Sequence, residues 1–197
     1  MEDTARLNLN KKTADEAQPA AKEILDHVKQ QIGMVPNLYA FMANAPGLLQ
    51  TYIRSQELFR RNSGFTPAEQ EVVFLSISFE NGCEYCMAAH SVIADTQSKV
   101  PPEVTEALRN GTEVADTRLR ALSEFTRTMV TKRGRPSQDE VGNFLRAGYT
   151  NEQVLQVILA VGIKTLSNYT NHVCHTPLDA RFASRVWKEP GSPSRAA

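Results

Sequence analysis

Apolar residues recur at helical spacing along most of this chain. Between residues 20 and 32, for example, Ile24, Leu25, Val28 and Ile32 lie one, three or four positions apart, which is the pattern of an amphipathic helix. Nowhere do apolar and polar residues alternate as they would in a half-buried strand. The fold class predicted is therefore all-α. Further helices are expected over 36–42, from Pro46 through Phe59, and over 67–81, 83–96, 101–110, 116–132, 137–147 and 153–174.

Local signals set some of the helix boundaries. Thr66 is a capping residue followed by proline at the first helical position and Glu69 at the third, which favours a helix start. Gly82 suits the end of that helix, and a new helix is expected from Cys83. The first dozen residues and the tail lack apolar periodicity. We therefore expect one helical domain over 13–187, a loose segment over 1–12 and a disordered tail over 188–197.

The chain contains an internal echo. Phe65–Gln70 precedes an apolar helix and then Cys86 and His90, and Tyr149–Gln153 precedes an apolar helix that reaches His172. Aligning the two segments leaves a one-residue offset at the histidines and places Asn168 where Cys86 stands. Two interpretations stay open: an internal helical duplication whose second copy has no thiols, or chance similarity between two capped apolar helices.

Composition excludes several classes of function. Lys+Arg and Asp+Glu both number 22, so the net charge is zero and nothing favours binding to nucleic acid. No run of eighteen apolar residues predicts a membrane span, and the polar N-terminus is unlike a signal peptide. We therefore expect a cytoplasmic, reducing setting. In that setting a C-x-x-C pair indicates redox or metal chemistry rather than a disulfide framework.

The candidate chemistry is concentrated at Cys83, Cys86 and His90. Spacings of three, four and seven place these residues on one face of a helix, and the free amides and dipole of its first turn favour a thiolate. If the two helices around Gly82 are antiparallel, Glu71 can reach His90, fix the imidazole tautomer and raise its basicity. Two alternatives remain: an inert buried pair of thiols, or a zinc site with Glu71 or His172 as the fourth ligand.

The spacing Glu71-x11-Cys83-x2-Cys86-x3-His90 resembles the signature of the AhpD-like (alkyl hydroperoxidase D) and carboxymuconolactone decarboxylase superfamily. The later run from Asn168 to Asp179 resembles its peroxidase-related branch. The resemblance covers about residues 34–181 and implies an orthogonal helical bundle. It also implies that Cys86 is the peroxidatic cysteine, that Cys83 resolves its sulfenic acid as a disulfide, and that His90 and Glu71 relay protons.

The resemblance carries further expectations. It implies a thiol-dependent peroxidase of the peroxiredoxin type that acts on small hydroperoxides without a cofactor or metal and is regenerated by an external dithiol or a protein disulfide reductant. It also implies a homo-oligomer, a hexamer or trimer before a dimer. Tyr85, Asn168 and His172 are candidates for the substrate pocket; Tyr85 stands where the best-known member of the family has an additional histidine. The alternatives are a thiol-disulfide relay with little peroxidase activity and a metal-binding, non-catalytic helical protein.

Overall fold

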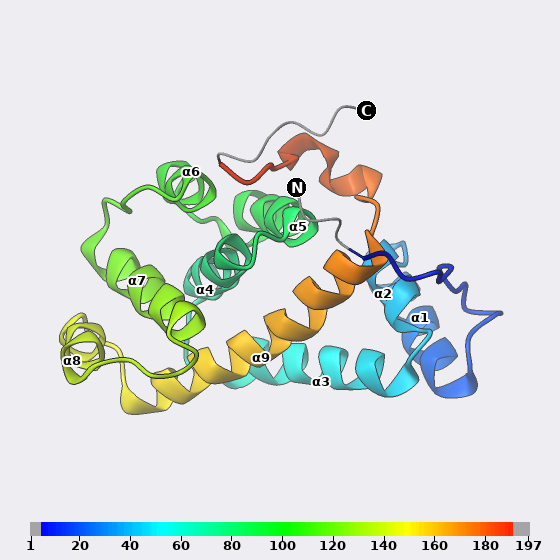
Figure 1. The fold of residues 1–197 in the computed structure, drawn as a ribbon, viewed down its shortest axis with the longest axis horizontal. Helices are drawn as coiled ribbons and strands as arrows, with labels where there is room; N and C mark the ends of the chain where they lie inside the picture. The colour runs from blue at the N-terminus through cyan, green and yellow to red at the C-terminus, as the bar shows by residue number, and fades with distance from the viewer. Residues whose placement is uncertain (1–4, 191–197) are drawn as a thin grey trace.

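The computed structural model describes residues 5–190, and all regular secondary structure within this part is helical, which confirms the predicted all-α class (Figure 1). A π-helical turn, η1, and a 3-10 helix, η2, accompany nine α-helices in this part of the chain. The elements are α1 (Pro19–Ile32), α2 (Asn37–Met42), α3 (Pro46–Asn62), α4 (Pro67–Glu80), α5 (Glu84–Ile93), η1 (Ala94–Ser98), α6 (Pro102–Asn110), α7 (Thr117–Thr131), α8 (Gln138–Arg146), α9 (Asn151–Cys174) and η2 (Ala180–Arg185).

Capping boxes fix the starts of three of these helices. The Thr66 side chain accepts a hydrogen bond from the Glu69 amide, and the Glu69 side chain accepts one from the Thr66 amide, as the sequence predicts. The same reciprocal pairing starts α8 at Ser137 and α9 at Thr150. Each pairing satisfies amides that have no partner within the helix. Each of the two similar segments, at Thr66 and at Thr150, therefore begins its helix with a capping box.

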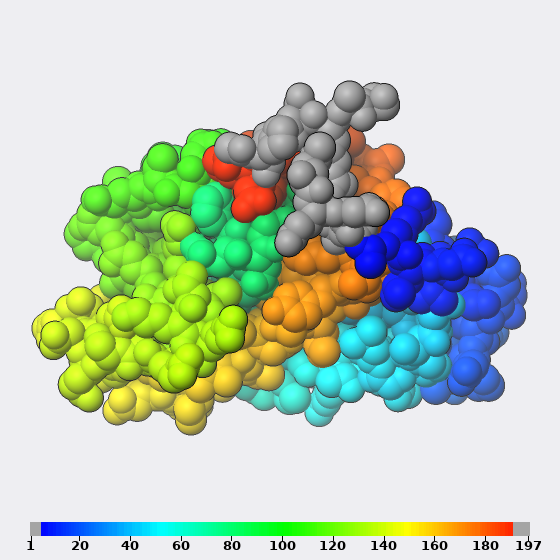
Figure 2. Space-filling model, viewed as in Figure 1, coloured from blue at the N-terminus to red at the C-terminus, as the bar shows by residue number. Residues whose placement is uncertain are grey.

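Helix α4 forms the centre of the core. Every residue from Glu69 to Ser78 is buried, because α4 packs against α5, α6, α7 and α9. A helix that is covered on all sides needs apolar residues around its whole circumference, which the run Val72–Leu75 supplies. Helix α9 passes α4 on one side and packs along α3 on the other (Figure 1). Figure 2 shows that part of α9 faces solvent between the surface of α3 and that of α7.

A short turn around Gly82 connects α4 to α5. Gly82 adopts a φ of +61°, a conformation that disfavours residues with a side chain. The helix after it begins at Glu84, with Cys83 as its cap. The sequence predicts one helix over 83–96, whereas α5 ends at Ile93 and the chain widens into η1. The amide of Val100 closes this wide turn on the Ala94 carbonyl at 3.0 Å.

The segments outside the helices also touch the body of the protein. Residues 5–12 form no helix, but the Leu7 amide donates to the Val173 carbonyl at 2.8 Å and the Lys12 amide to the Ala40 carbonyl at 2.9 Å. Residues 1–4 of the expected loose segment and 191–197 of the expected tail lie outside the described residues. Within residues 5–190, no helix combines the length and the apolar character that crossing a membrane requires.

Candidate active site

The two thiols lie at the start of α5. Cys83 is the cap of this helix and Cys86 is its third residue, so both belong to the turn whose amides lack partners within the helix. Both cysteines are free, and their exposed fractions are 1% for Cys83 and 2% for Cys86. The chain thus holds a reduced dithiol in a nearly dry environment, close to the positive end of a helix dipole.

Polar side chains of α9 contact both sulfurs. The Asn171 amide nitrogen lies 3.3 Å from the sulfur of Cys86 and 3.6 Å from that of Cys83, and it donates to both. The Cys86 thiol contacts the Ser167 hydroxyl oxygen at 3.9 Å. Lys164, one turn earlier on α9, has no exposed surface. Sequence reasoning assigned no role to Asn171 and missed Ser167 and Lys164, although their spacings of three, four and seven repeat those of the C-x-x-C helix.

A buried carboxylate bridges an imidazole and a guanidinium. Glu71, on α4, accepts from His90 Nδ1 at 2.7 Å through Oε2, which confirms the predicted contact between them. Its other oxygen, Oε1, forms an ion pair with Arg60 of α3 at 2.5 Å. No pattern in the sequence pointed to Arg60. With Nδ1 engaged, the imidazole presents Nε2 for proton transfer. Among residues 5–190, no hydrogen bond links His90 directly to either sulfur.

The pKa values of the two thiols are shifted in opposite directions. Burial opposes ionisation of Cys86, but the hydrogen bond from Cys83 and the positive charge of Lys164 outweigh it, so the pKa of Cys86 lies well below that of a free thiol. Burial and the interaction with Cys86 raise the pKa of Cys83 well above its ordinary value. The arrangement therefore favours one thiolate, on Cys86, and one protonated thiol, on Cys83.

The acid and the base of the Glu71–His90 pair are also shifted. Burial alone would raise the pKa of Glu71, but His90 and Arg60 hold it below its ordinary value. Burial and the charge of Lys164 lower the pKa of His90, and the carboxylate of Glu71 offsets only part of this effect. At neutral pH the pair is therefore a carboxylate and a neutral imidazole, which can accept a proton at Nε2.

The three candidates for a substrate pocket have other contacts. The Tyr85 hydroxyl donates to Asp179 at 2.5 Å, and its ring packs edge-on against Phe182. The Asn168 carbonyl oxygen accepts from the Asn81 amide at 2.9 Å. His172 is half-buried and stacks on the ring of Tyr169. Tyr85 thus contacts η2 and the residue before it, whereas Asn168 and His172 lie on α9.

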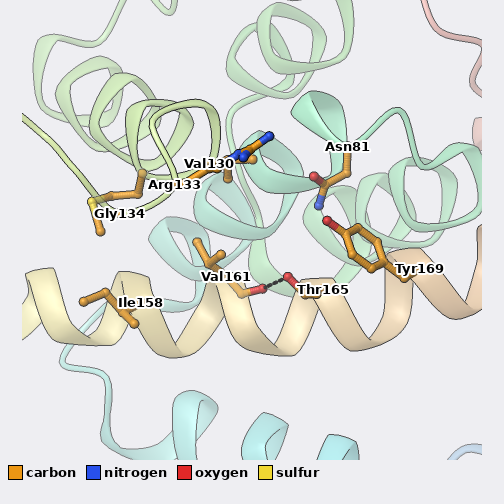
Figure 3. Close-up of a pocket in the computed structure, with 9 residues that line it drawn as sticks. Asn81, Val130, Arg133, Gly134, Ile158, Val161, Thr165 and Tyr169 are labelled. Carbon is orange, nitrogen blue, oxygen red and sulfur yellow. Dashed lines mark hydrogen bonds between the residues drawn. The ribbon is translucent and has the colours of Figure 1, made fainter.

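A cavity of about 370 Å³ lies between α9 and the end of α7 (Figure 3). Neither thiol lines it. Asn81 lines the cavity, and its side-chain amide donates to Asn168, a fully buried residue of α9. The lining residues are Asn81, Met129, Val130, Arg133, Gly134, Ile158, Val161, Thr165 and Tyr169.

The zinc alternative has no geometric support in the described part of the chain. Within residues 5–190, no three side chains among His, Cys, Asp and Glu are placed to hold a metal ion. His90 Nδ1 is directed at Glu71. The sulfurs face an amide donor, Asn171, which cannot act as a ligand through its nitrogen while it donates to them.

Comparisons with known proteins identify a family match in one segment of the chain and a shared fold. Residues 46–128 match the Carboxymuconolactone decarboxylase family. No curated protein matches the chain. Among solved structures it is similar to an alkylhydroperoxidase AhpD core, a peroxidase-related protein from Ralstonia eutropha JMP134, with a TM-score of 0.79 and 20% identity over 95% of this chain and 100% of that one.

Two further structures are similar at the same level. A peroxidase-related protein from Silicibacter sp. TM1040 has a TM-score of 0.75 and 18% identity over 93% of this chain and 96% of that one. A cysteine-to-alanine variant of the debrominase Bmp8, in complex with 2,3,4-tribromopyrrole, has a TM-score of 0.75 and 16% identity over 93% and 97%. The protein is thus an all-helical protein with the AhpD-like fold. Its residues 46–128 match the Carboxymuconolactone decarboxylase family, and the likeness to the solved structures is one of fold.

Proposed function

We propose that this protein is a thiol-dependent peroxidase, an alkylhydroperoxidase-like oxidoreductase, that reduces small hydroperoxides with its Cys83–Cys86 dithiol. One observation carries the proposal: a single amide donor contacts both thiols of a C-x-x-C pair, and His90, one turn after Cys86 on α5, is bonded to Glu71 of α4 at 2.7 Å. A low-pKa thiolate beside a protonated thiol is the pairing that peroxide reduction by a dithiol needs.

In the first step, the Cys86 thiolate attacks the terminal oxygen of the hydroperoxide. A sulfur–oxygen bond forms, the oxygen–oxygen bond breaks, and the alkoxide leaves as an alcohol after taking one proton. His90 relays this proton: its unprotonated Nε2 takes the proton up from solvent and passes it to the alkoxide, while Nδ1 stays directed at Glu71. The sulfur of Cys86 is oxidised by two electrons to a sulfenic acid, and the peroxide is reduced to an alcohol.

In the second step, the sulfur of Cys83 attacks the sulfenic sulfur of Cys86. A disulfide forms, and the hydroxide leaves as water with the proton that Cys83 gives up. The raised pKa of Cys83 supports this role, because the thiol keeps its proton until the sulfenic acid needs it. An external dithiol then restores the pair by thiol-disulfide exchange, supplying two electrons and two protons.

The burial of the sulfurs favours a small substrate over a protein partner. Exposed fractions of 1% and 2% leave little surface on which the active site of another protein could dock. A thiol-disulfide relay with another protein needs such an approach. We therefore rank the relay second, and we expect the reductant to be a small dithiol. We place the reaction in a reducing, cytoplasmic compartment, because the pair must return to its reduced form.

Steady-state consumption of hydrogen peroxide and an alkyl hydroperoxide, measured with a panel of dithiols, tests the proposal. We expect turnover in the wild type, its loss in Cys86→Ser and a reduced rate in His90→Gln. Cys83→Ser should stop after one turnover with a sulfenic acid on Cys86, which dimedone traps. Cys174→Ser is the matched control and should behave as wild type. Cys174 is also a buried thiol, but it is the last residue of α9 and not part of the C-x-x-C pair.

The outcomes separate the candidate functions. Wild-type rates in both Cys86→Ser and His90→Gln would refute the proposed nucleophile and base. Fast disulfide exchange without peroxide consumption would favour the relay, and one bound zinc per chain, removable by a chelator, would favour the metal-binding alternative. Release of bromide from a brominated pyrrole, assayed in parallel, would redirect the proposal toward the chemistry of the debrominase with the same fold.

We also propose that the protein is a homo-oligomer, a hexamer or trimer before a dimer. Helix α9 presents large apolar side chains to solvent that a second subunit would cover, and the burial of apolar surface favours association. Light scattering of the purified protein measures the subunit number. The side chains concerned, with exposed fractions from 38% to 63%, are Leu155, Ile158, Tyr169 and Val173.

A further inference from the structure

The side-chain nitrogen of Lys164 is buried and makes no hydrogen bond among residues 5–190. Its side chain has no exposed surface, and its Nζ lies 5.4 Å from the centroid of the Phe74 ring. The same ring packs against His90 at 5.0 Å between centroids. A cation–π contact compensates only part of the cost of burying a charge. An anion close to Lys164 would compensate the remaining cost of burying its positive charge.

Lys164 lies on the face of α9 that covers the dithiol. Ser167 follows it by three residues and contacts the sulfur of Cys86; Asn171 follows it by seven and donates to both sulfurs. Residues separated by three, four and seven share one face of a helix. Lys164 therefore lies on the same side of α9 as the two sulfur contacts, about one turn before Ser167 and two turns before Asn171.

The carboxylates nearest the dithiol have partners other than Lys164. Arg60 is already matched by the carboxylate of Glu71. Burial lowers the pKa of both His90 and His172, so neither imidazole is charged at neutral pH. Burial raises the pKa of the nearby phenols, which stay neutral. The titratable groups that act on Cys86 or on which it acts are Tyr39 of α2, Tyr52 of α3, Cys83, Tyr85 and His90 at or within α5, and Lys164 and His172 of α9. Three carboxylates lie one contact further away: Glu71 pairs with His90 and Arg60, Asp179 accepts from the Tyr85 hydroxyl and the Asn37 amide, and Glu189 acts on His172.

We propose that the Lys164 ammonium is the counter-ion of the Cys86 thiolate and thereby selects Cys86, rather than Cys83, as the nucleophile. Lys164 is a positioning residue, since it acts on the reacting sulfur through its charge. The proposal deepens the dithiol function proposed above and rests on it for its purpose. The thiolate itself can be measured without peroxide, so the two proposals can fail separately.

The test is a titration of the reduced protein followed by the ultraviolet absorbance of the thiolate. In the wild type we expect one thiolate per chain that loses its absorbance only when the pH falls well below the range of free thiols, and that is absent from Cys86→Ser. An opposite charge at short range lowers a pKa by about 1–3 units, so Lys164→Met should raise the midpoint by that amount. Lys164→Arg keeps the charge and should restore most of the shift.

Matched variants exclude a structural explanation. Lys132→Met removes a surface ammonium that pairs with Glu140 and should leave the midpoint unchanged. Lys164→Gln removes the charge but keeps a polar end, and it replaces the methionine variant if that variant does not fold. Circular dichroism confirms folding in each case.

An unchanged Cys86 midpoint in the folded Lys164→Met or Lys164→Gln variant would overturn the inference, as would a wild-type midpoint equal to that of a free thiol. If the midpoint shifts as expected while the wild type consumes no peroxide, the counter-ion stands and the peroxidase proposal falls. Peroxide turnover that keeps its pH profile in Lys164→Met has the opposite meaning: the peroxidase stands and the counter-ion falls.

Discussion

Replacing Glu71 by glutamine should invert the tautomer of His90. The Arg60 guanidinium can only donate, so the introduced side-chain amide would turn its oxygen toward Arg60 and its NH₂ group toward His90. Nδ1 would then have to accept, and the ring proton would move to Nε2. The imidazole would keep its position but could no longer accept a proton on the side that serves the substrate. Loss of general acid–base catalysis of this kind costs about 10²–10⁴-fold in rate.

The same substitution should cost little stability. Breaking a fully buried ion pair costs about 3–5 kcal/mol. The Arg60 side chain keeps 29% of its surface exposed and also donates to Gln70 at 3.0 Å, so it can be solvated when its partner changes. We therefore expect a loss of about 1–3 kcal/mol, below the full buried-pair cost. Glu71→Gln should remain folded, and its defect should be catalytic.

Nitrogen NMR of the histidine ring and single-turnover peroxide kinetics test this prediction together. The matched control is Glu69→Gln, which makes the same change on the same helix. Glu69 is also buried and paired with an arginine, Arg118, but it does not contact His90. The reasoning fails if Nε2 of His90 stays unprotonated in Glu71→Gln, or if the two glutamine variants lose the same fraction of their rate.

Two further predictions concern stability. Tyr85→Phe removes the donor at 2.5 Å from the buried Asp179 carboxylate and should lower the free energy of unfolding by about 1–3 kcal/mol. In urea denaturation the exposed Tyr169→Phe should stay within about 0.5 kcal/mol of wild type, and equal effects of both variants would contradict the role of the hydrogen bond. The pKa of His90 is lower in the folded chain than its ordinary 6.5, so the unfolded chain binds the proton first as the pH falls. The Cys86 thiolate, whose pKa is also lowered, makes stability fall from the free-thiol range downward, and the His90 contribution adds to this decline below about pH 6.5 until the folded pKa is reached. Glu71, whose folded pKa is lowered as well, adds a further decline below about 4.5, where the unfolded chain takes up its proton first. His90→Gln should make the profile shallower below about pH 6.5, and identical pH profiles of the wild type and His90→Gln between about pH 7 and 5 would show that the imidazole is not held neutral.

Local signals account for what the sequence predicted well. The capping box at Thr66 and the stop at Gly82 depend on neighbouring residues, so both could be located without knowing the fold. The contact between Glu71 and His90 followed from these two signals, since one turn reverses the chain between the two helices that carry them. The widening into η1 has no such signal, because it depends on where the Val100 amide finds its acceptor.

The missed residues depend on contacts between distant helices. Lys164 is a single charge within an apolar helix, and nothing near it in the sequence shows whether it faces solvent or the interior. Its burial becomes evident only when α9 is packed against α4 and α5. Arg60 likewise looks like an ordinary basic residue in the last turn of α3, where it favours the helix dipole. Its pairing with Glu71 requires the crossing of α3 and α4.

The shared spacing on α9 has a consequence for comparing relatives. The segment that matches the family ends at residue 128, whereas Lys164, Ser167 and Asn171 lie beyond it. Two proteins with the same C-x-x-C segment can therefore differ in thiol acidity if their last long helices differ. Relatives would be better grouped by the combination of C-x-x-C with K-x-x-S-x-x-x-N than by either motif alone. A one-residue insertion in α9 before Lys164 would rotate Lys164, Ser167 and Asn171 by about 100° around the helix axis, away from the sulfurs.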